Sequence, residues 1–158
     1  MRIQTVKISG FRGISFCANY IENPAQVNWD ECAFQIQFAT ALPSLSAIIG
    51  PNSCGKSSVL YALQYFFGTT TKLPNVDLYN SKDTSQPIII EVTLQGPIQE
   101  PVDWHATHCI KIEEEYQFSY LSITSPEGRA NFIRKPNGDL KKANAADKDL
   151  IVGLLPKF

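Results

Sequence analysis

The residues of this chain with the clearest chemistry lie between positions 50 and 57. The run Gly50-Pro51-Asn52-Ser53-Cys54-Gly55-Lys56-Ser57 matches the pattern G-x-x-x-x-G-K-[ST] at every fixed position. Its two glycines let the backbone turn tightly around an anion, with the loop amides pointing inward. In such loops the lysine neutralises the β- and γ-phosphates, and the last residue offers a hydroxyl to Mg²⁺. The motif therefore predicts a site for ATP, or for GTP, with magnesium.

The segments on both sides of this motif have the patterns needed to hold it. Residues 45–49 are a short apolar run, which is typical of a buried strand that is parallel and central in its sheet. Residues 56–67 predict a helix that ends at Gly68. A helix in this place directs its dipole and its first N–H groups at the bound phosphates. Its expected buried side consists of Val59, Leu60, Leu63, Phe66 and Phe67.

The rest of the chain predicts mostly β structure. Residues 17–32 are irregular in pattern, and the polar stretch 69–86 is expected to be a loop. The predicted fold class is α/β, with a mixed sheet and an antiparallel β subdomain around the P-loop of an NTPase. Alternation and apolar runs indicate strands at 2–9, 33–39, 88–94, 109–114, 116–124 and 129–135, and a last helix at 145–155.

The composition is that of an ordinary globular domain. The 158 residues carry a formal net charge of -1, which gives no global case for binding nucleic acid or membranes. No apolar stretch approaches the ~20 residues that span a bilayer, and the N-terminus lacks the apolar region of a signal peptide. We expect a cytoplasmic protein without membrane contact, whose four cysteines stay reduced.

Two further phrases resemble known ATPases. The first combines Ile8-Ser9-Gly10-Phe11-Arg12-Gly13-Ile14 with Asn52 and the pair Ser57-Ser58, and it is similar to the SMC/RecF branch of ABC-type ATPases. The second runs through Val76-Asp77-Leu78-Tyr79-Asn80, Asp83-Thr84-Ser85 and residues 87–94, and it resembles the OLD family. Members of that family resemble ATP-dependent nucleases of bacterial anti-phage defence, in which an N-terminal ABC-type ATPase precedes a C-terminal Toprim nuclease. The resemblance covers residues 1–95 and is weaker in the residues that follow.

Motif and resemblance together define the expected site. By resemblance, Arg12 lies close to the nucleotide, on its phosphate or its adenine side, since a guanidinium favours phosphate. Ser57 is the expected Mg²⁺ ligand. The predicted ATP-binding residues are Asn52, Ser53, Cys54, Gly55, Lys56, Ser57, Ser58 and Arg12.

Several elements of a complete ABC-type site do not occur in this sequence: a Gln loop, a signature like L-S-G-G-Q, and a Walker B strand ending in Asp-Glu. Residues 88–91 have the apolar run of a Walker B strand, but Glu91 stands where Asp is needed, and an alternating strand explains the pattern better. We therefore expect residues 1–158 to be the N-terminal portion of an ABC-type head, without its C-terminal half or a nuclease domain. Such a half site should bind ATP, and hydrolyse it only when a partner or further chain completes it.

The expected role is control of a DNA-acting effector in anti-phage defence. The expected partners are a second head of the same kind, a nuclease or other effector, and DNA contacted through the complete protein. Two alternatives stay open: a non-catalytic scaffold that binds nucleotide to hold an oligomer together, and a RecF/SMC-type repair ATPase with coiled-coil heptads downstream. A GTPase needs N-K-x-D, whose letters Asn80-Ser81-Lys82-Asp83 has in the wrong order. The β-rich second half disfavours a small P-loop kinase.

Other groups of reactive or charged residues favour structural roles. Residues 103–109 include metal-ligand types, but one strand cannot turn them all to one ion, so a polar loop leading into a strand is expected. Glu113-Glu114-Glu115 is expected to be a solvated turn. Cys54 lies beside a helix N-terminus, so its alkylation is expected to block nucleotide binding. Acidic neighbours dilute a basic run, which is expected to be solvated rather than bound to DNA: Arg129, Arg134, Lys135, Lys141 and Lys142.

Overall fold

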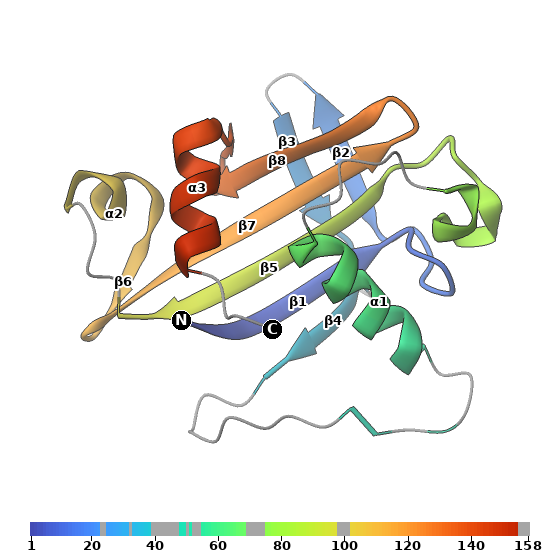
Figure 1. Cartoon of the computed structure of the whole chain (residues 1–158), viewed down its shortest axis with the longest axis horizontal. Helices are drawn as coiled ribbons and strands as arrows, with labels where there is room; N and C mark the ends of the chain where they lie inside the picture. Colours follow the sequence, from blue (N-terminus) through green and yellow to red (C-terminus); the bar gives the residue numbers. More distant parts are fainter. Residues whose placement is uncertain are drawn as a thin grey trace.

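A seven-stranded sheet forms the centre of the chain in a computed structural model that describes residues 1–22, 25–31, 33–38, 48–49, 51, 55–68, 75–97 and 102–154 (Figure 1). The strand order is β4-β1-β5-β7-β8-β9, with β6 pairing to β7, and β2-β3 forms a separate two-stranded sheet. The strands are β1 (Arg2–Ser9), β2 (Ala18–Glu22), β3 (Ala25–Trp29), β4 (Phe34–Gln37), β5 (Ile88–Gly96), β6 (Ile110–Ile112), β7 (Glu115–Ser125), β8 (Gly128–Arg134) and β9 (Leu140–Lys142). The helices are α1 (Lys56–Phe67), α2 (Val102–His108) and α3 (Ala145–Leu154), with two short 3-10 turns, η1 (Val76–Leu78) and η2 (Asn80–Lys82).

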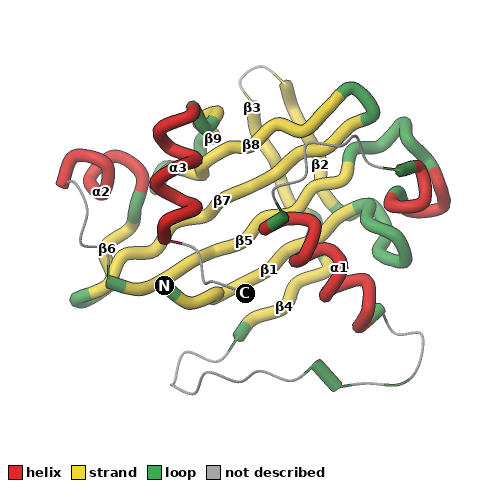
Figure 2. The backbone as a smooth tube through the Cα atoms, in the orientation of Figure 1, coloured by secondary structure: helices red, strands yellow, loops and turns green. Residues whose placement is uncertain are grey.

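The central strand β5 is buried on both of its faces. Because side chains alternate along a strand, Ile90 and its even-numbered neighbours share one face and Ile89 the other. The first face packs with β1 and the buried sides of α1 and α3, and the second packs with the β2-β3 hairpin. Figures 1 and 2 show both helices on one side of the sheet and the hairpin behind it. The sheet is thus the middle layer, and α1, which follows the P-loop, lies on its helix-covered side.

Most of the predicted elements are confirmed. Strands occur within or around 2–9, 33–39, 88–94, 109–114, 116–124 and 129–135, and helices form at 56–67 and 145–154. Every described pairing in the large sheet is antiparallel. The parallel strand expected at 45–49 lies mostly outside the described residues, and neither Ile48 nor Ile49 is in a strand.

Two predictions about irregular segments were wrong. Residues 17–32, expected to be irregular, contain the β2-β3 hairpin, which is stabilised by contacts with residues distant in the sequence. Trp29 Nε1 donates to Glu91, and Arg134 Nη2 donates to the carbonyl of Val27. Residues 103–108, expected to be a polar loop, belong to α2, because His105 and His108 turn inward and are buried.

Arg129 holds the end of α1 against the sheet. It lies at the start of β8, and its Nη1 and Nη2 donate to the carbonyls of Tyr65 and Phe66 at 3.1 and 2.7 Å. A cation at a helix C-terminus also complements the helix dipole. The amide of Gly68 closes the helix by donating to Gln64, as predicted for this glycine. These contacts fix the axis of α1, and with it the direction in which the helix start points.

A buried polar cluster joins α2 to β9 and α3. His108 Nδ1 lies 3.0 Å from the Trp104 carbonyl, which can only accept, so this nitrogen carries the proton. Its Nε2 then accepts from the Lys141 ammonium at 3.1 Å, and Lys141 also pairs with Asp147 at 3.1 Å. Burial, together with Lys141, lowers the pKa of His108 below its ordinary value of 6.5, against the opposing effects of the Trp104 carbonyl and Asp147. Protonation of His108 would turn its Nε2 into a donor, so a charged imidazole would face the Lys141 ammonium.

This cluster predicts a loss of stability in mild acid. Because the folded-state pKa of His108 is lower than that of the unfolded chain, the unfolded state binds protons first as the pH falls. The contribution of His108 is therefore fully present above pH 6.5 and declines below it. We expect urea midpoints to fall between pH 7.5 and 5, and His108→Gln to flatten that slope. Equal slopes for both proteins would contradict this role.

Candidate nucleotide-binding site

The start of α1 has the features of an anion site. Gly55 precedes the helix with a left-handed φ of 89°, and a Cβ added there would meet no atom within 4 Å. Its N-cap, Gly55, has no side chain to cap the first turn, and that turn contains no acidic residue. Helix N-termini carry unbonded amides and partial positive charge, so an end without a carboxylate suits an anionic ligand.

Polar groups that suit a phosphate and a metal ion gather at this helix start. The Lys56 ammonium donates to the carbonyl of Pro51, five residues earlier in the motif. Ser57 is exposed in the first turn, and the neighbouring Ser58 is half-buried. A cation, a hydroxyl and helix amides are the donor set that a nucleotide phosphate with Mg²⁺ requires, so the residues present fit that ligand. The residues that would hold it are Lys56 for the phosphates and Ser57 for the ion.

Part of the predicted loop is not described. Gly50, Asn52, Ser53 and Cys54 lie outside the described residues, so their roles stay predictions, as does the effect of modifying Cys54. Ile49, next to the loop, is 91% exposed.

The structure brings Arg12 to the same helix. The turn after β1 places the Arg12 guanidinium carbon 4.5 Å from the ring centroid of Tyr61, which projects from α1. A Cβ added to Gly13 would lie 3.7 Å from the Ser58 hydroxyl. The turn therefore packs along the first half of α1, and the contact with nucleotide that the resemblance implies for Arg12 stays a prediction. Sequence reasoning missed Tyr61, whose contact joins residues 49 positions apart.

The segment from Val76 to Lys82 fixes this turn from the other side. The amide of Arg12 donates to Leu78 at 2.8 Å, and its carbonyl accepts from Asn80 Nδ2 at 2.7 Å. The amide of Asn80 donates to Gly10 at 2.9 Å, and Phe11 forms a β-bridge with Tyr79. The phrase that resembled the OLD family thus contains the residues that hold the Arg12 turn.

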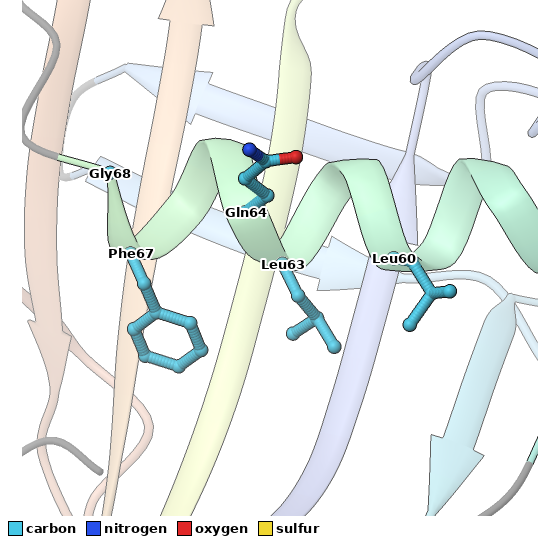
Figure 3. Close-up of a pocket in the computed structure, with 5 residues that line it drawn as sticks. All are labelled: Leu60, Leu63, Gln64, Phe67 and Gly68. Atoms are coloured by element: carbon cyan, nitrogen blue, oxygen red, sulfur yellow. The ribbon is translucent and has the colours of Figure 1, made fainter. Parts of the chain in front are cut away.

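One flank of α1 bears an open apolar hollow, and Leu60, expected on the buried side of the helix, is exposed there. Val59, Ala62 and Phe66 are buried against the sheet, whereas Leu60 is 60% exposed. A hollow of about 350 Å³ lies on this flank. Figure 3 shows the three apolar side chains of its lining pointing to one side of the helix and Gln64 pointing away from them. The hollow is lined by Leu60, Leu63, Gln64, Phe67 and Gly68.

The basic run of the second half is mostly engaged within the fold. Arg129 binds the end of α1, and Arg134 forms an ion pair with Glu91 at 2.6 Å. Lys141 pairs with Asp147. These contacts indicate structural roles. The three side chains are more buried than the solvated surface that was expected for this run.

The acidic residues considered as catalytic or metal-binding candidates form contacts within the fold. Glu115 accepts two hydrogen bonds from Arg2, at 2.8 and 2.7 Å, so it is not merely a solvated turn residue. Glu91 lies in β5 with Arg134 and Trp29, which confirms the strand interpretation. The described residues contain no group of three or more His, Cys, Asp or Glu side chains that could hold a metal ion. No helix in the described part of the chain has both the length and the apolarity needed to cross a bilayer.

The G-x-x-x-x-G-K-S motif before α1, and the position of that helix on the sheet, agree with a domain of the P-loop NTPase class. The chain matches the AAA ATPase domain family over residues 1–151. This match spans nearly the whole sequence, so the chain belongs to the AAA ATPase domain family. No curated protein matches the chain.

Proposed function

We propose that this domain binds ATP with Mg²⁺ at the start of α1. The observation that carries the proposal is the first turn of α1, which follows Gly55, contains no acidic residue, and presents the Lys56 ammonium bonded to Pro51 and an exposed Ser57. Lys56 balances phosphate charge, Ser57 supplies a ligand to the ion, and the helix amides bind phosphate oxygens. When bound, Mg²⁺ would offset part of the phosphate charge. ATP is favoured over GTP because the sequence lacks the N-K-x-D loop.

Beyond this, we propose that the chain is the N-terminal portion of an ABC-type, SMC/RecF-like head. Two observations support this: Arg12 lies against α1, and one flank of that helix bears an open apolar hollow. The sequence lacks a signature motif and a Walker B strand, so a second head or further chain would have to supply them. Hydrolysis would then await assembly of two heads, because phosphoryl transfer depends on positioning and charge.

The role that fits such a head is control of a DNA-acting effector in anti-phage defence, as in the OLD family. The described arginines of the basic run bind within the fold, so DNA contact is assigned to the complete protein rather than to this surface. The gene sequence after codon 158 distinguishes the candidates. A Toprim acidic cluster would support the OLD-family role, and heptad repeats would support a RecF/SMC-type repair ATPase. A chain with neither would support a nucleotide-dependent scaffold.

Competition against a fluorescent ATP analogue tests the ligand. We expect ATP to displace the analogue at a lower concentration than GTP does. Chelating Mg²⁺ with EDTA is expected to weaken binding about tenfold or more, because the ion offsets phosphate charge. Equal displacement by GTP would overturn the preference for ATP. Failure of every nucleotide to displace the analogue would overturn the proposed function.

A further inference from the structure

Tyr61 and Arg12 form a stacked pair beside the start of α1. The guanidinium carbon lies 4.5 Å from the ring centroid, well within the range of a cation–π contact. Ser57 and Tyr61 are four residues apart in one helix, so they lie on the same side of it. The stacked guanidinium is therefore held over the side of α1 that presents the Ser57 hydroxyl. Tyr61 is 49% exposed, so the core does not require this side chain.

Hydrogen bonds from a neighbouring segment hold the backbone of Arg12 in a left-handed conformation. Its φ is 52°, in the left-handed region that residues with a side chain rarely adopt. Such a conformation costs free energy and persists only where the surroundings determine it. Here the determinants are the hydrogen bonds of the Arg12 amide to Leu78 and of the Arg12 carbonyl to Asn80. Backbone and guanidinium are thus held separately, the first by the η1-η2 segment and the second by the Tyr61 ring.

Within the described residues, the charge of Arg12 has no carboxylate partner. The acids of the neighbouring segment have other partners: Asp77 pairs with Lys82 at 3.0 Å, and Asp83 accepts from the Ser85 hydroxyl. An aromatic face orients a guanidinium without cancelling its charge, so that charge remains for an anionic ligand.

We propose that Tyr61 is a positioning residue, whose ring sets the guanidinium of Arg12 beside the start of α1 so that it contacts the phosphates of a bound nucleotide. This inference rests on the proposed function and deepens it. It adds to the P-loop a second cationic group that is oriented before the nucleotide arrives, which reduces the side-chain ordering that binding would otherwise require.

A double-mutant cycle on Mg²⁺-ATP affinity tests this role by calorimetry. Tyr61→Leu is expected to weaken binding about two- to five-fold, the equivalent of one exposed cation–π contact. Tyr61→Phe keeps the ring and is expected to bind like the wild type. In an Arg12→Gln background, Tyr61→Leu is expected to have no further effect. An equal loss from Tyr61→Leu with and without Arg12, or no loss at all, would overturn the proposal.

Two controls separate this inference from the function on which it rests. If Lys56→Ala binds ATP like the wild type, the proposed function fails and the role of Tyr61 fails with it. If Lys56→Ala loses binding but Tyr61→Leu does not, only the role of Tyr61 fails. The NMR shift of Arg12 Hε, recorded without nucleotide, reports the stacking directly. We expect a ring-current shift that Tyr61→Phe keeps and Tyr61→Leu abolishes; an unchanged shift in Tyr61→Leu would overturn the stacked geometry.

Discussion

Replacing Glu91 with alanine is expected to lower the free energy of unfolding by about 3 kcal/mol. The Glu91 residue is 5% exposed, and its carboxylate accepts from Arg134 Nε at 2.6 Å and Nη2 at 2.8 Å. It also accepts from Trp29 Nε1 at 2.5 Å. Removing the carboxylate leaves a largely buried guanidinium without its counter-charge and a half-buried indole N–H without its acceptor. The change therefore also loosens the attachment of the β2-β3 hairpin to the sheet.

Urea denaturation of Glu91→Ala checks this effect, with Glu114→Ala as the control. Glu114 is exposed in the turn before β7, so its loss is expected to change stability by less than about 0.5 kcal/mol. At temperatures where Glu91→Ala is folded, we expect it to bind Mg²⁺-ATP like the wild type, since Glu91 serves the fold rather than the ion. Equal stability of the two variants would contradict the structural role of Glu91. A loss of Mg²⁺-ATP binding by folded Glu91→Ala alone would support a Walker B role for Glu91.

Replacing Gly10 with alanine is expected to have a similar effect on stability and a further effect on the site. Gly10 has a φ of 72°, and a Cβ added to it would lie 2.9 Å from the Pro87 carbonyl oxygen. The left-handed conformation alone costs about 1–2 kcal/mol for a residue with a Cβ, and the backbone clash adds to it, for a total of about 3 kcal/mol. Because Gly10 also accepts from the Asn80 amide, the shift is expected to displace the Arg12 turn and weaken ATP binding.

Gly138→Ala is the matched control for that change. Gly138 has a φ of 91°, but a Cβ added there would meet no atom within 4 Å. It therefore reports the cost of the left-handed backbone without the clash, about 1 kcal/mol, and leaves ATP binding unchanged. If denaturation gave equal losses for both variants, the close approach of Gly10 to Pro87 would not contribute to stability.

Local patterns were enough to predict the elements that carry their own periodicity. The spacing of Ile88 and Ile90 predicts strand β5, and that of Val59 and Phe66 predicts helix α1. In each case the spacing puts apolar side chains on one face, which the fold then buries. The β2-β3 hairpin could not be predicted in this way. Its stability comes from Trp29 and Val27 contacting residues more than sixty positions away.

The same limit applies to α2 and to the site. At seven residues, α2 is too short to be stable alone, and it forms because Trp104, His105 and His108 pack inward, although histidines are not typical core residues. The P-loop motif predicted Lys56 and Ser57 by type and spacing alone. The partners of Arg12, by contrast, are Tyr61 and Asn80, which only the folded chain brings together.

The most direct test of the central claim is a calorimetric titration of Mg²⁺-ATP into the wild-type chain and into Lys56→Ala, with Lys142→Ala as a control for loss of an exposed lysine. The account predicts saturable binding by the wild type and by Lys142→Ala. In Lys56→Ala it predicts a loss of about a hundredfold or more, since the variant lacks the cation that faces the phosphates. Unchanged affinity in a folded Lys56→Ala protein would contradict nucleotide binding at the start of α1.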